Sequence, residues 1–476
     1  MQARTAWNVT PYRPFLFDRG EIYICRVAPE RNGISFAWLP LEDADEYQIF
    51  FGKRGAEKNC IGSTTQCAYC VENLECGTEY QFQVCCGARK SLVRLARTGE
   101  HVGTVVNYLH PEDAYYAFSG QYLCSPSLVR HPDGHLLAAM DLYAADAPQN
   151  LSLLFRSDDD GDTWHYVTEL YPCFWPKLFI HRGILYVLAC STEYGDLLIG
   201  CSKDGGSSFS SPQVILRGSC NPGWPGVHKN PQPVIERDGR LWNSIEWGCW
   251  RQRTHAASVI SAAADADLLR PESWHITPPL PYDPAWPGTA KGESAGSLEG
   301  TLVSAPDGRL LDVMRYEMAG CTPNFGTVLA YEVNTKDPDA QLRFDHAISF
   351  PANHAKFEIR LDPVSGCYVS IADRILSSDT PAQRNVLSLL YSRDLEHWHT
   401  ALDLLDYHHA DPAYTGFQYV DFLIEGSDLL FLCRTAMNHA HSFHDSNYST
   451  FHRLKDFRKY LLGGKSCGVQ ASTSSD

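Results

Sequence analysis

Apolar and polar residues alternate with a period of two along several short stretches of the first hundred residues. The alternation is clear in Ile34-Ser35-Phe36-Ala37-Trp38 and in Tyr80-Gln81-Phe82-Gln83-Val84. This period places successive side chains on opposite faces of a strand, so both stretches are predicted to be half-buried β-strands. Residues 1–104 are therefore expected to form a small β-sandwich.

From about residue 120, the pattern changes to a repeated unit of two apolar strands joined by a turn that contains glycine. Asp-Gly and related pairs supply the positive φ angles that tight hairpins need. The glycines of successive turns are 49 to 69 residues apart, which leaves room for four strands in each unit. The six turns are Pro132-Asp133-Gly134, His181-Arg182-Gly183, Arg237-Asp238-Gly239, Pro306-Asp307-Gly308, Pro363-Val364-Ser365-Gly366 and Glu425-Gly426-Ser427.

Six units of this length predict an all-β fold, in which a six-bladed β-propeller over residues 105–462 follows the small β-sandwich. Residues 463–476 are rich in Gly and Ser and are expected to form a disordered tail. The 476 residues are thus interpreted as two domains, of which the larger is a single closed ring.

Charge and composition narrow the classes of function. The formal net charge of −16 disfavours binding to nucleic acid or to an anionic membrane surface. No run of about 18 apolar residues predicts a transmembrane helix, and no apolar segment after Arg4 resembles a signal peptide. The 17 cysteines are odd in number and several lie in apolar runs, which does not suit a disulfide framework. A reducing, cytoplasmic location is therefore predicted.

Two groups of side chains raise the question of a metal. Cys67 and Cys70 form a CxxC pair in the first domain, but no second pair stands at the spacing of a zinc site. A polar segment near the C-terminus also has no known metal spacing; it contains His439, His441, His444 and Asp445. Free thiols and hydrogen bonding to substrate are the preferred interpretations, and no metal or cofactor is predicted.

Propeller geometry brings the start of the first strand and the end of the second strand of each unit to the central axis. Strands that only pack would carry apolar or small residues there, yet these positions hold carboxylates, bases, His and Tyr. Such a cluster suits acid–base chemistry or binding of a charged sugar, and a solvated rim is the structural alternative. The residues expected to bind substrate are Trp175, Lys177, Glu193, Tyr194, Arg315, Lys356, Arg374, Arg434 and His444, and His228 is a candidate acid–base group.

Three segments resemble the Asp boxes of sialidase-like propellers. Residues 157–164 follow the pattern S-x-D-x-G-x-T-W, residues 202–209 follow it loosely, and residues 392–398 are a degenerate copy. In such boxes an Asp side chain binds the backbone amides of the turn, so their predicted role is structural. Leu74 and residues 77–82 resemble the end of a fibronectin type III domain, in which Trp38 would be the buried indole.

The resemblance to sialidases implies roles for particular residues. Glu299 and Arg315 match the Glu and Arg of the family's fourth blade, and Tyr419 matches the nucleophilic Tyr of the sixth. Arg374 matches an Arg of the fifth blade, and Asp141 lies close to the place of the acid. Because a phenol has a pKa near 10, it needs a carboxylate base, so Tyr419 with Glu299 is the expected nucleophilic pair.

One departure from the family concerns the substrate. The first of the three Arg residues that bind the carboxylate of sialic acid is replaced here by Cys124. A thiol cannot make the bidentate contact of a guanidinium, so a substrate other than sialic acid is predicted.

The predicted activity is that of an exo-acting glycoside hydrolase on a small acidic or deoxy-sugar-containing oligosaccharide. Two alternatives stay open on the same scaffold. One is a uronate-directed lyase of the rhamnose–glucuronate type, in which His228 or Tyr419 would remove the proton next to a carboxylate. The other is a non-catalytic propeller that binds glycans. In all three cases the partner is a small-molecule carbohydrate, and the sequence does not indicate the oligomeric state.

Overall fold

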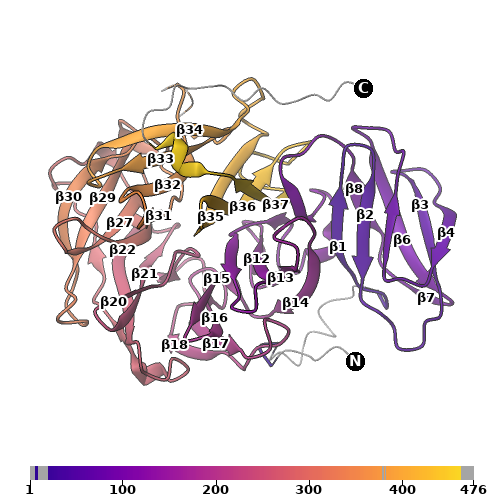
Figure 1. The fold of residues 1–476 in the computed structure, drawn as a ribbon, viewed down its shortest axis with the longest axis horizontal. Helices are drawn as coiled ribbons and strands as arrows, with labels where there is room; N and C mark the ends of the chain where they lie inside the picture. The colour runs from indigo at the N-terminus through magenta and orange to yellow at the C-terminus, as the bar shows by residue number, and fades with distance from the viewer. Residues whose placement is uncertain (1–5, 9–19, 378–379, 381, 462–476) are drawn as a thin grey trace.

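The structure is a computed structural model that describes residues 6–8, 20–377, 380 and 382–461. Regular structure in these residues consists of β-strands and three short 3-10 helices, η1 (Ala114–Tyr116), η2 (Pro271–Ser273) and η3 (Phe457–Tyr460). The prediction of an all-β fold is confirmed (Figure 1). Within the described residues, no helix has the length and apolar character needed to cross a bilayer. The predicted tail, 463–476, lies outside the described residues.

Two sheets face each other in the N-terminal part of the chain, where the period-two pattern predicts strands. The first contains β1 (Ile24–Pro29), β2 (Ile34–Trp38) and β5 (Ala68–Val71). The second contains β3 (Tyr47–Lys53), β4 (Asn59–Thr64), β6 (Glu79–Cys86), β7 (Arg89–Lys90) and β8 (Arg94–Arg97). The apolar side chains of both sheets share one core.

Two contacts in this core are of the kind that the resemblance to fibronectin type III domains implies. Trp38 is buried, with its ring 5.2 Å from that of Tyr47. The hydroxyl of Tyr80 accepts a hydrogen bond of 3.1 Å from the backbone amide of Glu75, five residues upstream. A tyrosine near the start of a strand that bonds back to the preceding loop is the corner contact of such sandwiches. The assignment to that family and the boundary at residue 104 stay predictions.

Six further sheets follow in chain order, and we number them 1 to 6. Sheet 1 contains β10 (Tyr122–Leu123), β11 (Ser127–Arg130), β12 (Leu136–Tyr143), β13 (Ser152–Ser157) and β14 (His165–Leu170). Sheet 2 contains β15 (Phe174–His181), β16 (Ile184–Cys190), β17 (Leu197–Ser202) and β18 (Gln213–Leu216). Sheet 3 contains β19 (Gly226–His228), β20 (Ile235–Arg237), β21 (Arg240–Cys249), β22 (Thr254–Ala263), β23 (Trp274–Ile276) and β24 (Leu280–Pro281).

Sheets 4 to 6 complete the ring. Sheet 4 contains β26 (Ser297–Ser304), β27 (Leu310–Tyr316), β29 (Thr327–Val333) and β30 (Arg343–Ser349), beside a ribbon of β25 (Lys291–Glu293) and β28 (Gly320–Thr322). Sheet 5 contains β31 (Ile359–Leu361), β32 (Tyr368–Asp373), β33 (Val386–Ser392) and β34 (Trp398–Asp406). Sheet 6 contains β35 (Gly416–Glu425), β36 (Asp428–Ala436), β37 (Tyr448–Leu454) and β9 (Thr104–Tyr108). These six sheets correspond to the six predicted units, and a blade count of six is our interpretation of them.

The two ends of the ring meet in sheet 6. Its outermost strand, β9, precedes sheet 1 in the chain and pairs antiparallel with β37, close to the C-terminus. The backbone hydrogen bonds between β9 and β37 join the start of the ring to its end, which stabilises the ring against opening. Within each sheet, the first strand of the unit lies next to the axis, so its residues and the adjoining end of the second strand can face a central pocket.

The sandwich lies beside the ring (Figure 1), and polar side chains join the two parts. The guanidinium of Arg26 donates to the carbonyls of Val106 at 3.0 Å and Val105 at 2.8 Å, in β9 and therefore in sheet 6. The guanidinium of Arg94 lies 2.6 Å from the carboxylate of Asp113, and both are buried. Removing one partner of a buried pair leaves the other charge uncompensated, so these contacts hold the two parts in a fixed relation.

The three segments that resemble Asp boxes fold as turns held by an aspartate. Asp159 Oδ1 accepts from the amide of Thr163 at 2.8 Å. Asp204 Oδ1 accepts from the amide of Ser208 at 2.9 Å, and Asp394 Oδ1 from the amide of His397 at 2.8 Å. All three turns join the last two strands of a sheet, away from the axis. These contacts satisfy the backbone of the turn, which is a structural role.

Candidate active site

A pocket of about 440 Å³ receives residues from all six sheets. Its lining consists of Cys124, Tyr143, Ala145, Phe174, Trp175, Glu193, Tyr194, Pro222, His228, Trp250, Arg251, Glu299, Arg315, Arg384, Tyr419, Arg434 and His444. We call this space the pocket. Four arginines and two glutamates line it, so its wall carries more positive than negative side chains although the whole chain is acidic.

Four pocket residues have a left-handed backbone: Tyr194 lies in the loop after β16, and the other three each lie at a bulge in the strand next to the axis. The φ angles are +52° for Trp175, +58° for Glu299 and +57° for Tyr419. The strand pairing shifts register around each of them, in β15, β26 and β35, which belong to sheets 2, 4 and 6. A non-glycine residue in this conformation costs on the order of 1–3 kcal/mol, and such strain gathers at functional sites.

Buried carboxylates from the neighbouring sheets support two of these bulges. Asp141, at the end of β12, accepts the backbone amide of Trp175 at 2.7 Å. Glu246, in β21, accepts the amides of Glu299 and of Gly300, the latter at 3.3 Å. Burial raises the pKa of Asp141 to about 7 and that of Glu246 to about 8. These two carboxyl groups therefore hold the backbone of pocket residues and are protonated over much of the neutral range.

Tyr419 and Glu299 form a hydrogen-bonded pair at the wall of the pocket. The phenol of Tyr419 donates to Glu299 Oε1 at 3.0 Å. Burial and the Glu299 charge raise the pKa of Tyr419, so the phenol keeps its proton and is the donor. The second carboxylate oxygen, Oε2, lies 2.7 Å from Arg315 Nη1, and the amide of Asn230 also donates to Oε1. Glu299 is thus held in place as a proton acceptor for the phenol.

Three guanidinium groups surround Tyr419. Arg315 Nη1 donates to its hydroxyl at 3.3 Å. The guanidinium carbons of Arg434 and Arg384 lie 5.1 Å and 5.7 Å from the centre of its ring. Because all three groups line the pocket and Glu299 is the carboxylate ion-paired within this group, the arrangement favours an anionic group on a ligand.

Arg434 also contacts the thiol of Cys124. Its Nη1 atom lies 2.9 Å from Cys124 Sγ, so a guanidinium is present next to position 124. The group comes from the end of β36 in sheet 6 rather than from the start of sheet 1. Burial raises the pKa of Cys124 to about 11, so the thiol is neutral and does not cancel the charge of Arg434.

Four further predicted residues line the pocket. Glu193 accepts a hydrogen bond of 3.4 Å from the amide of Gln149, and burial raises its pKa to about 7. His228 Nδ1 lies 2.9 Å from Glu246 Oε2. Burial lowers the pKa of both His228 and His444 to about 4, so both rings are neutral at pH 7. Tyr194, the fourth, accepts the amide of Trp250 at 2.9 Å through its hydroxyl.

Four residues of the predicted site lie outside the pocket lining. Arg374 forms an ion pair with Asp403 in β34. Lys177 lies 2.7 Å from the buried carboxylate of Asp421, and Lys356 Nζ donates at 2.7 Å to the carbonyl of Val420. The fourth is Asp141, which is fully buried. A side chain outside the lining whose polar atoms bind other protein groups is not available to a substrate.

Sequence reasoning missed Arg384, Asn230, Tyr143 and Trp250. Arg384 precedes β33 in an irregular segment, and Asn230 lies in the break between β19 and β20. Tyr143 ends β12, two positions beyond Asp141, the residue considered at that strand end. Trp250, which is 38% exposed at the pocket rim, follows β21 in a tight turn. The signal that finds Tyr143 and Trp250 is an aromatic residue at a strand end next to the axis; Arg384 and Asn230 have no such regular position.

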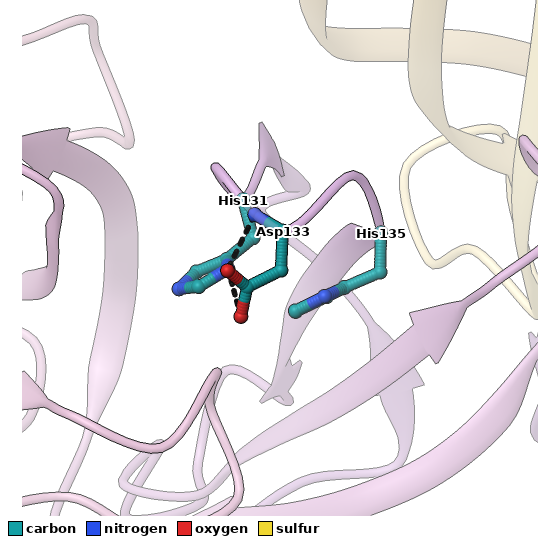
Figure 2. A group of neighbouring side chains, drawn as sticks. All are labelled: His131, Asp133 and His135. Atoms are coloured by element: carbon teal, nitrogen blue, oxygen red, sulfur yellow. Dashed lines mark hydrogen bonds and ion pairs between the residues drawn. The ribbon is translucent and has the colours of Figure 1, made fainter.

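One group of side chains in the structure has the composition of a metal site. Within the part of the chain that the structure describes, one group of three donors lies within 4.8 Å: His131, Asp133 and His135, in the turn between β11 and β12 (Figure 2). The two rings stack at 4.5 Å with planes 16° apart, so their in-plane lone pairs do not point to a common ion. His131 Nδ1 accepts the amide of Asp133 at 3.2 Å, which stabilises the turn. His441 and His444 both bond to Asp445, at 2.8 Å and 2.9 Å.

The chain resembles known proteins in its fold and not in its sequence. No protein-family model matches its sequence, and no curated protein does. Among solved structures, an α-L-arabinofuranosidase from Fusarium graminearum matches with a TM-score of 0.52 and 13% identity, over 76% of this chain and 99% of that one. An α-L-arabinanase from Penicillium chrysogenum matches with a TM-score of 0.49 and 15% identity, over 76% and 99%. An intramolecular trans-sialidase from Ruminococcus gnavus matches with a TM-score of 0.49 and 12% identity, over 77% and 100%. The likeness at this level of identity shows the fold, which is that of a β-propeller.

Proposed function

We propose that this protein is a glycoside hydrolase that removes a terminal acidic sugar from a small oligosaccharide. The observation that carries the proposal is the hydrogen bond of 3.0 Å from Tyr419 to Glu299 in a pocket lined by arginines. A phenol is a weak nucleophile until a base accepts its proton, and Glu299 is placed to do so. Attack of the phenol oxygen on the anomeric carbon would give a glycosyl-enzyme intermediate, which water then hydrolyses.

The arginines support the choice of an acidic sugar. Arg315, Arg384 and Arg434 are guanidinium groups, which bind a carboxylate through charge-assisted hydrogen bonds. Each nitrogen of Arg434 also donates within the protein, to Cys124, Ser446 or the carbonyl of His444, so this arginine contributes mainly its charge. A neutral pentose, such as the arabinose units that the Fusarium and Penicillium enzymes are named for, has no group that needs three guanidinium groups. The pocket volume of about 440 Å³ favours a terminal residue over the middle of a chain.

Cys124 argues less strongly against a sialidase than its sequence position suggests. The guanidinium of Arg434, 2.9 Å from the thiol, supplies a third positive group next to that position. Its direction of approach differs, because it extends from sheet 6. We therefore keep the class at acidic sugars, with the carboxylate expected in a different orientation from that in sialidases.

A screen of an oligosaccharide library, analysed by mass spectrometry, tests the proposal. Acidic oligosaccharides are expected to give two products whose summed mass exceeds the substrate by one water. Tyr419→Phe and Glu299→Gln should abolish this conversion, whereas Tyr414→Phe, an exposed tyrosine in the loop before β35, should not change it. Full activity in both of the first two variants would contradict the proposal.

One observation keeps a second candidate function open. His228 lines the pocket as a neutral imidazole, which is the form that can accept a proton next to a carboxylate, and this suits a uronate-directed lyase. Elimination gives a product with a carbon–carbon double bond that absorbs in the near ultraviolet, and its products sum to the mass of the substrate. The same screen therefore separates the two reactions: an absorbing product that is lost in His228→Gln supports the lyase.

A further inference from the structure

Cleavage by Tyr419 needs a second group that gives a proton to the leaving oxygen, and this inference rests on the proposed function. The sequence-based choice, Asp141, does not line the pocket. Its side chain is fully buried, and its Oδ2 accepts the backbone amide of Trp175 at 2.7 Å. A carboxyl group that supports the backbone from beneath cannot reach a glycosidic oxygen inside the pocket.

Glu193 is the carboxyl group that faces the pocket without a cation beside it. It lies in the loop that follows β16, and it lines the same pocket as Tyr419 and Glu299. In the described residues, its carboxylate accepts a hydrogen bond of 3.4 Å from the side-chain amide of Gln149. Glu299, by contrast, lies 2.7 Å from Arg315. The two carboxyl groups of the pocket thus have different environments: Glu299 has a guanidinium beside it, and Glu193 does not.

The groups around Glu193 keep its proton on the carboxyl. Burial raises its pKa to about 7. The titratable groups that face it are the phenols of Tyr143, at the end of β12, and Tyr194, the next residue in the loop. Burial raises the pKa of both phenols above 10, so neither is charged near neutral pH. A group with a pKa close to the working pH can both give and take a proton during turnover.

The three groups come from alternate sheets around the axis. Tyr419 belongs to sheet 6, Glu299 to sheet 4 and Glu193 to the loop that leaves sheet 2. A sugar bound in the pocket therefore has the nucleophilic pair on one side and Glu193 on another. We propose that Glu193 is the general acid and base of the reaction.

Both steps balance with these residues. In the first, the phenol oxygen bonds to the anomeric carbon, the phenol proton passes to Glu299, and the Glu193 proton goes to the departing oxygen as the glycosidic bond breaks. In the second, Glu193 takes a proton from water, the hydroxide oxygen bonds to the anomeric carbon, and the bond to Tyr419 breaks as Glu299 returns its proton. The sum is the addition of one water to one glycosidic bond.

Other carboxyl and imidazole groups near the pocket fit this role less well. Glu246 is buried beneath the lining, and both of its oxygens are engaged, by two backbone amides and by His228. His228 and His444 are neutral above about pH 5 because burial lowers their pKa to about 4. A neutral imidazole is a poor acid for protonating the alkoxide oxygen of the departing sugar.

The test compares leaving groups. A panel of 4-nitrophenyl glycosides, with uronides and deoxy sugars included, first identifies a sugar that the wild-type protein releases. The 2,4-dinitrophenyl and methyl glycosides of that sugar are then compared in wild type, Glu193→Gln and Glu236→Gln. Glu236 is an exposed residue in the middle of β20, and its variant is the matched control.

The expected result for Glu193→Gln is a loss of about 10²- to 10⁴-fold in kcat/KM on the methyl glycoside. Little change in the first step is expected on the dinitrophenyl glycoside, which needs no acid. Sodium azide should restore turnover of the dinitrophenyl glycoside, because azide replaces the water that Glu193 would activate. The fall in wild-type activity on the methyl glycoside above pH 7 should disappear in the variant.

The outcomes separate this inference from the function on which it rests. If Tyr419→Phe abolishes hydrolysis of both glycosides while Glu193→Gln has the same activity as Glu236→Gln on both glycosides, the hydrolase stands and Glu193 is not its acid. If Glu193→Gln slows both glycosides equally and azide has no effect, Glu193 binds substrate and the inference is overturned. If the wild-type protein releases no glycoside, the proposed function fails and the inference fails with it.

Discussion

The Nη1 atom of Arg434 lies 2.9 Å from Sγ of Cys124 in the wall of the pocket. The thiol is neutral because burial raises its pKa to about 11, so it does not compete with a ligand for the charge of Arg434. A position that lacks an arginine in the sequence therefore has a guanidinium beside it in the fold. This relation places three positive groups around Tyr419 and leads to the first prediction.

Arg434→Met should weaken the reaction on an acidic sugar more than on the matching neutral sugar. Loss of a charge-assisted hydrogen bond costs about 1.5–3 kcal/mol, which corresponds to roughly 10- to 150-fold in kcat/KM. Arg434→Lys keeps the charge but not the bidentate geometry, so it should recover part of this loss. Steady-state kinetics on both sugars gives the measurement. Arg393→Met, at an exposed site, is the control, and an equal loss on both sugars would contradict the role.

Arg384→Ala and Arg374→Ala should differ sharply. Arg384 lines the pocket beside the ring of Tyr419, whereas Arg374 pairs with Asp403 outside the lining. The first substitution is expected to raise KM for an acidic substrate at least tenfold, which is about 1.4 kcal/mol of binding, and the second to leave KM and kcat unchanged. Binding of the same substrate to the Tyr419→Phe background gives an independent readout. The reverse order of effects would show that the sequence-based choice of Arg374 was better.

Buried carboxyl groups predict how stability changes with pH. Glu246 has a pKa of about 8 in the fold and near 4 in the unfolded chain, so between these values the folded state binds more protons. Its contribution therefore falls as the pH rises, by up to about 1.4 kcal/mol per pH unit. Histidines of the unfolded chain titrate near pH 6.5 in the wild type and in a Glu246 variant alike, so the difference between the two proteins from pH 6.5 to 8 isolates Glu246.

Glu246→Gln should flatten this dependence, because the amide is neutral at every pH and can still accept the Glu299 and Gly300 amides. Urea unfolding at pH 6.5, 7 and 8 measures it. The free energy of unfolding of the wild type should drop more steeply than that of the variant over this window. Parallel curves would mean that Glu246 is not protonated in the folded protein.

The turn of residues 157–164 should matter for stability and not for catalysis. Asp159 accepts the amide of Thr163 at 2.8 Å, far from the axis. Asp159→Ala is expected to lower the free energy of unfolding by about 1–2 kcal/mol, which is the cost of an unsatisfied turn. Asp162→Ala, at an exposed neighbour in the same turn, serves as the control. A loss of kcat in the folded Asp159 variant would contradict the structural role.

Regular strands made much of the site predictable. Glu299 and Arg315 lie near the axial ends of β26 and β27, where a position along the strand also gives a position in the ring. Tyr419 lies near the start of β35 in the same way. The repeated glycine turns predict the number of units, because each unit joins its first two strands through a turn that contains glycine.

The depth of each side chain along the central axis, and so whether it lines the pocket, was not predictable from the sequence. Lys177 follows Trp175 by two residues, yet its amine pairs with Asp421 beneath the pocket while the indole of Trp175 lines it. The bulges at Trp175, Glu299 and Tyr419 cause this difference, because an extra residue changes which side chains face the axis. A bulge depends on the carboxylate from the neighbouring sheet, such as Asp141, and that contact joins residues 34 apart in sequence.

The central claim is that Tyr419 becomes covalently bonded to the sugar. Rapid acid quenching of the protein with an activated acidic glycoside, followed by mass spectrometry of the intact chain and its peptides, tests this most directly. The account predicts an added mass of one glycosyl unit on the peptide that contains Tyr419, enriched in Glu193→Gln and absent in Tyr419→Phe. Undiminished hydrolysis by Tyr419→Phe, with no adduct on the wild-type peptide, would contradict it.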